Sequence, residues 1–305
     1  MNEVNFDQFK CRCSQINKML STSRSNPVLT EKQADKLREY EKKASLTEAQ
    51  KVELADLLVK KENSKKVILS DTCIGYLMDE YSWMRYGFVR VTRELLDVPQ
   101  MQKGKIVEPE SLALLSLVDD VEYIANVSPE KERERVYNEY LSGEVDAWAG
   151  ESIMTAQIIP DIKSIWDHPT FLTKIIEPIT KDNDWQVKGY MDITFAPVGF
   201  IANCLVSAPE EEINKMKFRL LNKLNVATEE APEFKYKWNL IEHSMRFNHL
   251  PIHQRVHKTN VNPMTAHERL MVYDRVKVCR EYLWKFHEQY ESLNVAATPT
   301  FDAKF

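Results

Sequence analysis

The chain has 305 residues, of which 43% are hydrophobic and 29% are charged. This composition is that of an ordinary globular protein, and the length suffices for one large domain or two small ones. The formal net charge of −5 argues against a protein that coats nucleic acid passively, so any nucleic-acid interface would be a local basic face.

Cysteine spacing and hydropathy indicate the cellular compartment in which the chain works. The five cysteines, at positions 11, 13, 73, 204 and 279, have neither the spacing of a disulfide framework nor that of a zinc site. A reducing compartment is the simplest interpretation. The N-terminal residues lack the apolar stretch of a signal peptide, and no run of 18 apolar residues occurs. We therefore expect a cytoplasmic protein that does not span a membrane.

Helical signals dominate the first part of the chain. Ser14 is a candidate N-cap for a short helix that begins near Ile16. Residues 28–66 predict a charged helical hairpin, which would be a solvated scaffold or an insertion. The start of each of its helices is indicated by a capping-box spacing, at Thr30-x-x-Gln33 and Thr47-x-x-Gln50.

Two further helices are expected before the first strands. Residues 70–98 predict a helix capped by Ser70 or Asp71, whose aromatic side chains are more typical of a core than of a base-stacking platform. In residues 101–118, Pro109 suits the first turn of a helix. The acids that flank this proline, Glu108 and Glu110, would then lie at the helix start, where either could complement the helix dipole.

A strand pair forms the centre of the predicted fold. The first strand, Leu141–Trp148, carries Asp146, and the second, within Ile153–Ile165, is mostly apolar but contains Asp161 and Lys163. Strand side chains alternate faces, so these last two point the same way. Burying an acid and a base there is costly unless they are paired or functional.

The remaining elements complete a mixed sheet. A strand is expected over Val121–Val127, helices over Phe171–Ile179 and Trp185–Phe195, and a further apolar strand over Gly199–Val206. The second helix would be capped by Asp184, and it places Gln186 and Tyr190 on one face. Residues 208–292 look mainly helical, with breaks at Pro251 and Pro263. The expected fold class is α/β (α+β), a mixed sheet flanked by helices.

Several short motifs in this order make the sequence resemble a known family. They are Gly104-x-x-x-Glu108, Gly143-x-x-Asp146, Pro160-Asp161-Ile162-Lys163, Gln186-x-x-x-Tyr190 and, near the N-terminus, Arg12-Cys-Ser14-Gln-Ile16. Together they are similar to the motifs of the PD-(D/E)XK nucleases, and within them of the phage lambda exonuclease and RecB-like branch (YqaJ-type viral recombinases). The resemblance covers roughly residues 10–24 and 100–210, and it implies a restriction-endonuclease-like fold.

The resemblance also implies roles for these residues. The side chains of Glu108, Asp146 and Asp161, with the carbonyl of Ile162, would hold one or two Mg²⁺ or Mn²⁺ ions, which prefer hard oxygen ligands. Lys163 would orient or deprotonate the attacking water. Gln186 and Tyr190 would position Lys163 or the DNA backbone. Ser14 and Arg12 would contact a phosphate.

Two alternatives remain at the level of single residues. Pro109 follows Glu108 directly, so Glu110 could be the first ligand, although Glu108 holds the family's spacing. The repeated His249, His253 and His257 could suggest a metal site, but Pro251 interrupts the helix that they would need. A surface facing solvent or DNA is the preferred interpretation for these histidines, together with Arg246, Arg255 and Lys258.

The resulting expectation is a metal-dependent exonuclease that acts on double-stranded DNA ends, in phage-type recombination or repair. The resemblance implies a single-strand annealing partner, a homo-oligomer and a location in the host cytoplasm if the chain is phage-encoded. Alternatives are an endonuclease of the same fold or a DNA-end-binding protein without catalysis. We expect a single nuclease domain over 1–294, with the insertion at 28–66, the core at 100–210, a helical part at 211–294 and a flexible tail at 295–305.

Overall fold

The computed structural model describes residues 4–22, 29–43, 45–65, 69–90, 99–127, 133–165 and 167–296. The chain divides into two compact units. One comprises Met1–Cys11, Gln15–Arg90 and Thr265–Phe305, and the other comprises Arg12–Ser14 and Val91–Met264. The prediction of one nuclease domain over 1–294 stays a prediction, and each unit is described by itself.

The first unit is helical. Besides the short turn η1 (Phe6–Gln8) it contains α1 (Ile16–Leu20), α2 (Glu31–Lys42), α3 (Glu48–Lys65), α4 (Asp71–Tyr86) and α10 (Ala266–Ala296). The predicted hairpin is confirmed: α2 and α3 pack through Leu37, Tyr40 and Leu57. Both capping boxes form, because Thr30 and Gln33, like Thr47 and Gln50, exchange side-chain and backbone hydrogen bonds.

Three expectations for this unit need correction. The cap of α1 is Gln15, and Ser14 lies in a preceding 3₁₀ turn, η2 (Cys13–Gln15). The predicted helix 70–98 begins as expected at the Ser70 cap but ends at Tyr86, because Gly87 adopts a left-handed conformation with φ of 73°. Residues 91–98 lie outside the described part. So does the predicted tail from 297 onward, whereas α10 includes residues 295 and 296.

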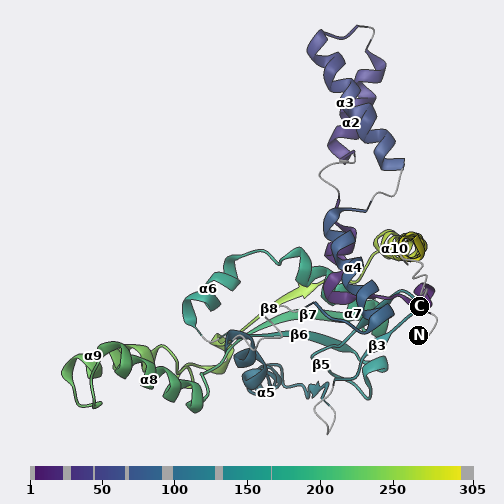
Figure 1. Ribbon diagram of the computed structural model, residues 1–305. Coiled ribbons are helices and arrows are strands. Elements are labelled where there is room, and N and C mark those ends of the chain that lie inside the picture. The colour runs from purple at the N-terminus through teal and green to yellow at the C-terminus, as the bar shows by residue number, and fades with distance from the viewer. Residues whose placement is uncertain are drawn as a thin grey trace, which may run out of the picture. The chain divides into compact units, whose positions relative to one another are not determined.

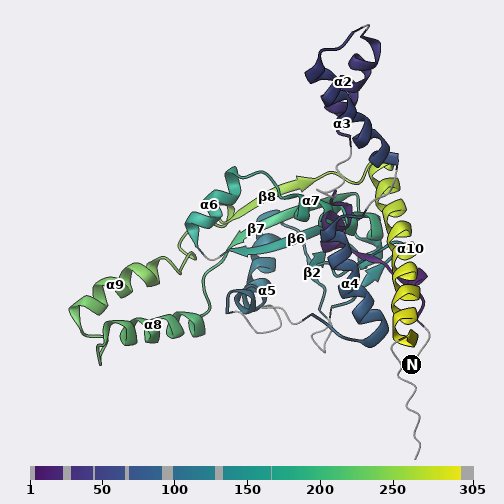
Figure 2. The ribbon, with the colours of Figure 1, turned by 45° about the horizontal axis from the view of Figure 1, so that its top comes forward.

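The second unit is built on a mixed three-stranded sheet (Figures 1 and 2). Strand β6 (Ile158–Ile165) runs parallel to β7 (Val198–Leu205), and β8 (Val256–Val261) is antiparallel to β7. One face is covered by α5 (Pro99–Asp119) and the other by α6 (His168–Ile176) and α7 (Lys181–Thr194). The mixed sheet with helices on its faces is the predicted fold class.

Alternation along the strands assigns side chains to the two faces of this sheet. Ile162, Phe200 and Ala202 pack under α5 with Leu114 and Leu115. On the other face, Ile201 and Val261 pack with Val187 and Met191 of α7. Asp161, Lys163 and Asn203 have the parity of Ile201, so these three polar residues lie on the face that α6 and α7 cover.

Smaller pairs of strands precede β6. Strand β3 (Val136–Tyr137) pairs with β4 (Leu141–Gly143), and β2 (Ile124–Ala125) pairs with β5 (Ala147–Trp148). The predicted strand Leu141–Trp148 is therefore divided between two sheets, because Asp146 turns away to hydrogen-bond with β6. The predicted strand Val121–Val127 is reduced to two residues, and Ile153 belongs to the turn η3 (Ile153–Thr155).

Three helix starts differ from the prediction. Helix α6 begins at His168 under a cap by Asp167, where the sequence predicted a start at Phe171. Helix α5 begins at Pro99, which takes the first-turn position expected for Pro109, and Pro109 lies inside the helix. Helix α7 begins at Lys181 under a cap by Thr180, and Asp184 instead forms an ion pair of 3.0 Å with Lys188.

The segment from 208 onward was predicted as mainly helical. Helices α8 (Glu210–Leu224) and α9 (Pro232–His243) form, and they share a core of their own around Phe234 and Trp238. The expectation is wrong for β8, a partly exposed edge strand after the turn η4 (Ile252–Gln254). No helix in the described ranges has the length and apolar character needed to span a bilayer.

Candidate functional site

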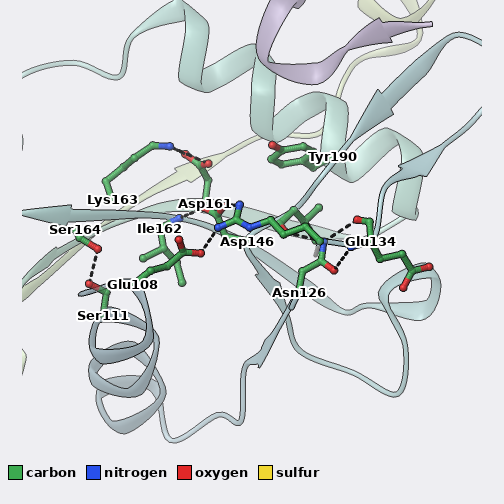
Figure 3. A network of polar contacts seen from close by, with 12 residues as sticks. Glu108, Ser111, Asn126, Glu134, Asp146, Asp161, Ile162, Lys163, Ser164 and Tyr190 are labelled. Atoms are coloured by element: carbon green, nitrogen blue, oxygen red, sulfur yellow. Dashed lines mark hydrogen bonds and ion pairs between the residues drawn. The ribbon is translucent and has the colours of Figure 1, made fainter. Parts of the chain in front are cut away.

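A cluster of polar side chains lies around β6, and in it Asp161 and Lys163 of this strand contact one another (Figure 3). The Asp161 side chain is fully buried, and Lys163 Nζ lies 2.9 Å from its Oδ2 and 3.1 Å from its Oδ1. The period of two along β6 brings them to the same face, as the sequence predicted. Lys163 keeps 37% of its side chain exposed, so this residue borders solvent.

Helix α7 supplies the next contact to Asp161. Gln186 Nε2 donates to Asp161 Oδ1 at 3.2 Å and to the Tyr190 hydroxyl at 2.9 Å. These two residues are four positions apart, which places them on the same face of the helix. The structure therefore brings together both members of the predicted Gln-x-x-x-Tyr element with the acid of β6.

Asp146 reaches β6 from the loop between β4 and β5. Its Oδ2 accepts a hydrogen bond of 2.9 Å from the backbone N–H of Ile162, and its Oδ1 accepts one of 2.7 Å from Arg133 Nη1. The carboxylate is thus held between the strand edge and a guanidinium group.

Arg133 joins the first acid to this cluster. Its Nη2 donates to Oε1 of Glu108 on α5, so one guanidinium bridges Glu108 and Asp146. Glu110, two residues further along the helix, is exposed. Of the two acids left open by the sequence, Glu108 is the one that lies in the cluster. Three carboxylates here face two cations, which leaves the site with a net negative charge.

Two functional candidates were missed by the sequence reasoning. Arg133 lies in a run of charged residues to which the sequence assigned no role, yet only 29% of its side chain is exposed. Asn126, which is buried, holds the neighbouring chain in place. Its side chain donates to Glu134 O and Val145 O and accepts from Glu134 N. Strand alternation gave no signal for Asn126, because it groups this residue with the exposed Glu122 and Ile124.

Burial and charge shift the pKa values of this cluster. Desolvation raises the pKa of Asp161 to about 6, against the opposing effect of Lys163. Desolvation lowers the pKa of Lys163, but the carboxylates Asp161, Asp146 and Glu108 outweigh it, and the net pKa is raised. Burial raises the pKa of Tyr190 well above its usual range. Lys163 is therefore a cation here, and Tyr190 a neutral hydroxyl.

The donor set of the cluster fits a hard divalent cation in its chemistry. All candidate ligands are oxygens, and the buried Asp161 Oδ2 accepts no well-directed hydrogen bond. Within the described ranges, however, no three acidic, histidine or cysteine side chains converge closely enough to hold a metal. The guanidinium of Arg133 bridges Glu108 and Asp146 and supplies a positive charge between them.

The N-terminal motif, Arg12–Ile16, lies near Tyr190 of α7. Arg12 and Ser14 are exposed and flank the buried Cys13. A Cβ at Gly143 would lie 2.6 Å from Tyr190 Cε1 and 3.1 Å from Cys13 Sγ, so glycine is required for the three segments to meet there.

The predicted basic surface near the histidines needs a correction. Arg255 is only 8% exposed, and its Nε donates to the carbonyl of Leu205, so it supports the sheet from inside. Lys258 instead pairs with Asp119 at 2.5 Å. His249 stacks on His243, with ring centroids 5.5 Å apart, and His257 lies on β8.

The fold has known counterparts among solved structures, although neither a family of related sequences nor a curated protein matches the chain. A phage-related exonuclease from Haemophilus somnus 129PT aligns with a TM-score of 0.55 at 16% identity, over 93% of this chain and 97% of that one. An alkaline exonuclease from Laribacter hongkongensis aligns with a TM-score of 0.50 at 9% identity, over 95% and 96%. At such identities the likeness concerns the fold, and the chain has the fold of these phage-related and alkaline exonucleases, as its motifs implied.

Proposed function

We propose that the chain is a Mg²⁺- or Mn²⁺-dependent exonuclease that hydrolyses phosphodiester bonds from the ends of double-stranded DNA. The observation that carries the proposal is one polar cluster: Asp161 and Lys163 lie on β6, Asp146 accepts from the Ile162 N–H, and Arg133 joins Glu108 to Asp146. They occur in a fold that the two exonucleases share.

The acids of the cluster would hold the metal. Glu108, Asp146 and Asp161 would be the carboxylate ligands. The backbone of Ile162 supports a fourth, because the N–H and C=O of one strand residue point to the same edge, and its N–H already faces Asp146. When bound, a divalent ion lowers the pKa of water and offsets charge on a phosphate.

Lys163 is the cation that meets the substrate. Its raised pKa keeps it protonated in the arrangement described, which favours stabilising charge on the phosphate over accepting a proton. Gln186 is a positioning residue, since it fixes the orientation of Asp161 and is itself bonded to Tyr190. The exposed Arg12 and Ser14 would contact a phosphate further along the same strand of DNA.

The biological setting follows from the resemblance of the motifs. It supports a role in phage-type recombination or repair, a single-strand annealing protein as partner, a homo-oligomeric assembly, and action in the host cytoplasm if a phage encodes the chain.

End-labelled linear duplex DNA and covalently closed circles, each incubated with Mg²⁺ or with EDTA, test the proposal. We expect Mg²⁺-dependent release of nucleotides from the linear DNA, intact circles, and a loss of at least about 100-fold in Lys163→Ala. The exposed Lys223→Ala, on α8, serves as the matched control. Cleaved circles would indicate an endonuclease, and binding of ends without any cleavage would indicate a non-catalytic protein.

A further inference from the structure

A second feature of the active face is a pocket next to Lys163. It has a volume of about 280 Å³ and lies between the sheet and the facing parts of α6 and α7. Figures 1 and 2 both show these helices on the same side of β6 and β7. Because Lys163 lines it, an occupant of the pocket lies beside the ammonium group that also contacts Asp161.

A buried amide makes this pocket more than a gap between elements. Asn203 is the register partner of Lys163 on β7 and is only 7% exposed. Its side-chain amide has no hydrogen-bond partner among the residues that the structure describes, and it lines the pocket. The amide is not among the fully enclosed polar atoms of the described residues, so it faces the pocket and gives a ligand one donor group and one acceptor.

The other residues that line the pocket suit the nucleoside part of a nucleotide. Ile165, Ile179 and Ile201 give an apolar wall, and the hydroxyl of Thr259 adds a polar group. A flat heterocycle offers an apolar face and an edge of donors and acceptors, and an amide can pair with that edge. The volume lies just below the range of roughly 300–1,000 Å³ for small-molecule sites, so it admits one nucleoside and excludes a base pair.

The charge of the pocket is compatible with a nucleotide. Its carboxylate, Glu177, is paired with Lys174 at 2.8 Å, which leaves no unpaired negative charge from that residue. The pocket is also separate from the Arg12–Ser14 segment. That segment approaches Tyr190, whereas the pocket reaches Asn183, near the N-terminal end of α7.

We propose that this pocket binds the nucleoside that flanks the scissile phosphate, on the side of Lys163 facing away from the Arg12–Ser14 segment. Asn203 contacts its base, Thr259 contacts its base or sugar, and Lys163 contacts its phosphate. The amide can present either donor or acceptor by turning over, so the pocket accepts more than one base. This proposal rests on the proposed nuclease function for its substrate.

A coupling experiment tests the assignment. Wild type and Asn203→Leu are assayed with Mg²⁺ on linear duplexes that carry either normal nucleotides or an abasic site next to the cleaved bond. We expect Asn203→Leu to raise KM about tenfold on normal DNA, which is the worth of one good hydrogen bond. On abasic DNA the two proteins should differ by less than about twofold, because the partner of Asn203 is then absent.

Thr259→Val gives a second, nearly isosteric variant in case Asn203→Leu folds poorly, and Asn214→Leu, on the exposed surface of α8, is the control. Equal losses for Asn203→Leu on normal and abasic DNA would overturn the proposal. If Asn203→Leu does not fold, a Thr259→Val variant with the wild-type KM on both normal and abasic DNA would also overturn the proposal.

Direct binding separates this inference from the nuclease proposal. Thymidine 5′-monophosphate is titrated into wild type and Asn203→Leu by calorimetry in the presence of Ca²⁺. Binding that Asn203→Leu weakens about tenfold supports the pocket even if no DNA is cleaved. If wild type does not bind the nucleotide, or if both proteins bind it equally, the pocket is not a nucleoside site. The nuclease proposal is unaffected by that result and depends on its own test.

Discussion

Arg133 donates a hydrogen bond of 2.7 Å to Asp146 and bridges it to Glu108. Two of the three carboxylates proposed to hold a metal thus share a single cation of the chain itself. Asn126 fixes the adjoining backbone, so this cation is held in place rather than free on the surface.

We therefore predict that Arg133 competes with a divalent metal. Removing its charge in Arg133→Ala should raise the affinity for Ca²⁺ or Mn²⁺ about tenfold, as measured by calorimetry without DNA. In EDTA the same variant should be less stable by about 1–2 kcal/mol, because two half-buried carboxylates lose their partner. The control is Arg135→Ala, whose exposed partner is Glu144. Unchanged or weaker metal binding would contradict the competition.

The first acid of the site is distinguished by a matched pair of substitutions. Glu108→Gln should reduce nuclease activity by at least about 100-fold, because it removes a carboxylate from the cluster around Arg133. Glu110→Gln alters an exposed side chain on the same helix and should stay within about twofold of wild type. Initial rates on end-labelled duplex DNA decide between Glu108 and Glu110. A large loss in Glu110→Gln with little loss in Glu108→Gln would make Glu110 the first metal ligand.

The buried carboxyl of Asp161 gives the stability an unusual pH dependence. Its folded pKa of about 6 lies above the ordinary value of 3.8, so the folded state retains a proton that the unfolded state loses between these values. Stability from this group is complete below pH 3.8 and decreases as the pH rises through about 6. Urea unfolding in EDTA should show Asp161→Asn gaining stability relative to wild type as the pH rises from 3.8 to about 6, with a constant difference above that. The raised pKa would be contradicted if the difference in unfolding free energy between Asp161→Asn and wild type did not change with pH, or if the variant lost stability relative to wild type.

Two glycines should respond oppositely to the same substitution. In Gly143→Ala the added methyl group meets the ring of Tyr190 and the sulfur of Cys13, so we expect a loss of about 1–3 kcal/mol and impaired activity. Gly75, inside α4, has no heavy atom within 4 Å of the corresponding position. Gly75→Ala should therefore be neutral or gain up to about 1 kcal/mol from helix propensity. Thermal melts of both variants provide the comparison.

The parts of the fold that the sequence predicts are those with a strong local signal. Strands β6 and β7 are long apolar runs, and the α2–α3 hairpin has two capping boxes. Strand β8 escapes prediction because it is an edge strand with polar residues such as His257 and Lys258, so its pairing with β7 depends on contacts distant in sequence. The start of α5 was misplaced because Pro99 and Pro109 are equally suited to a first turn.

The same division holds within the site. Asp161, Lys163, Gln186 and Tyr190 follow from the periods of one strand and one helix, and the structure brings them together. Arg133 does not follow, because its meeting with Glu108 joins a loop to a helix 25 residues away in the chain. No local period encodes such a contact, and an arginine within a charged run is indistinguishable from a solvated one.

The outer edge of β6 also bears on how the chain avoids self-association. Backbone N–H groups alternate between the two edges of a strand, and the outward positions here belong to residues 158, 160, 162 and 164, the first three of which have no free N–H. Ile158 is bridged to Ala149, Pro160 has no N–H, and the N–H of Ile162 is taken by the Asp146 carboxylate. An acid proposed for catalysis therefore also closes a strand edge that could otherwise pair with another molecule. Asp146→Ala should consequently aggregate more than Asp146→Asn, which keeps an acceptor for Ile162, and light scattering of the two inactive proteins would reveal the difference.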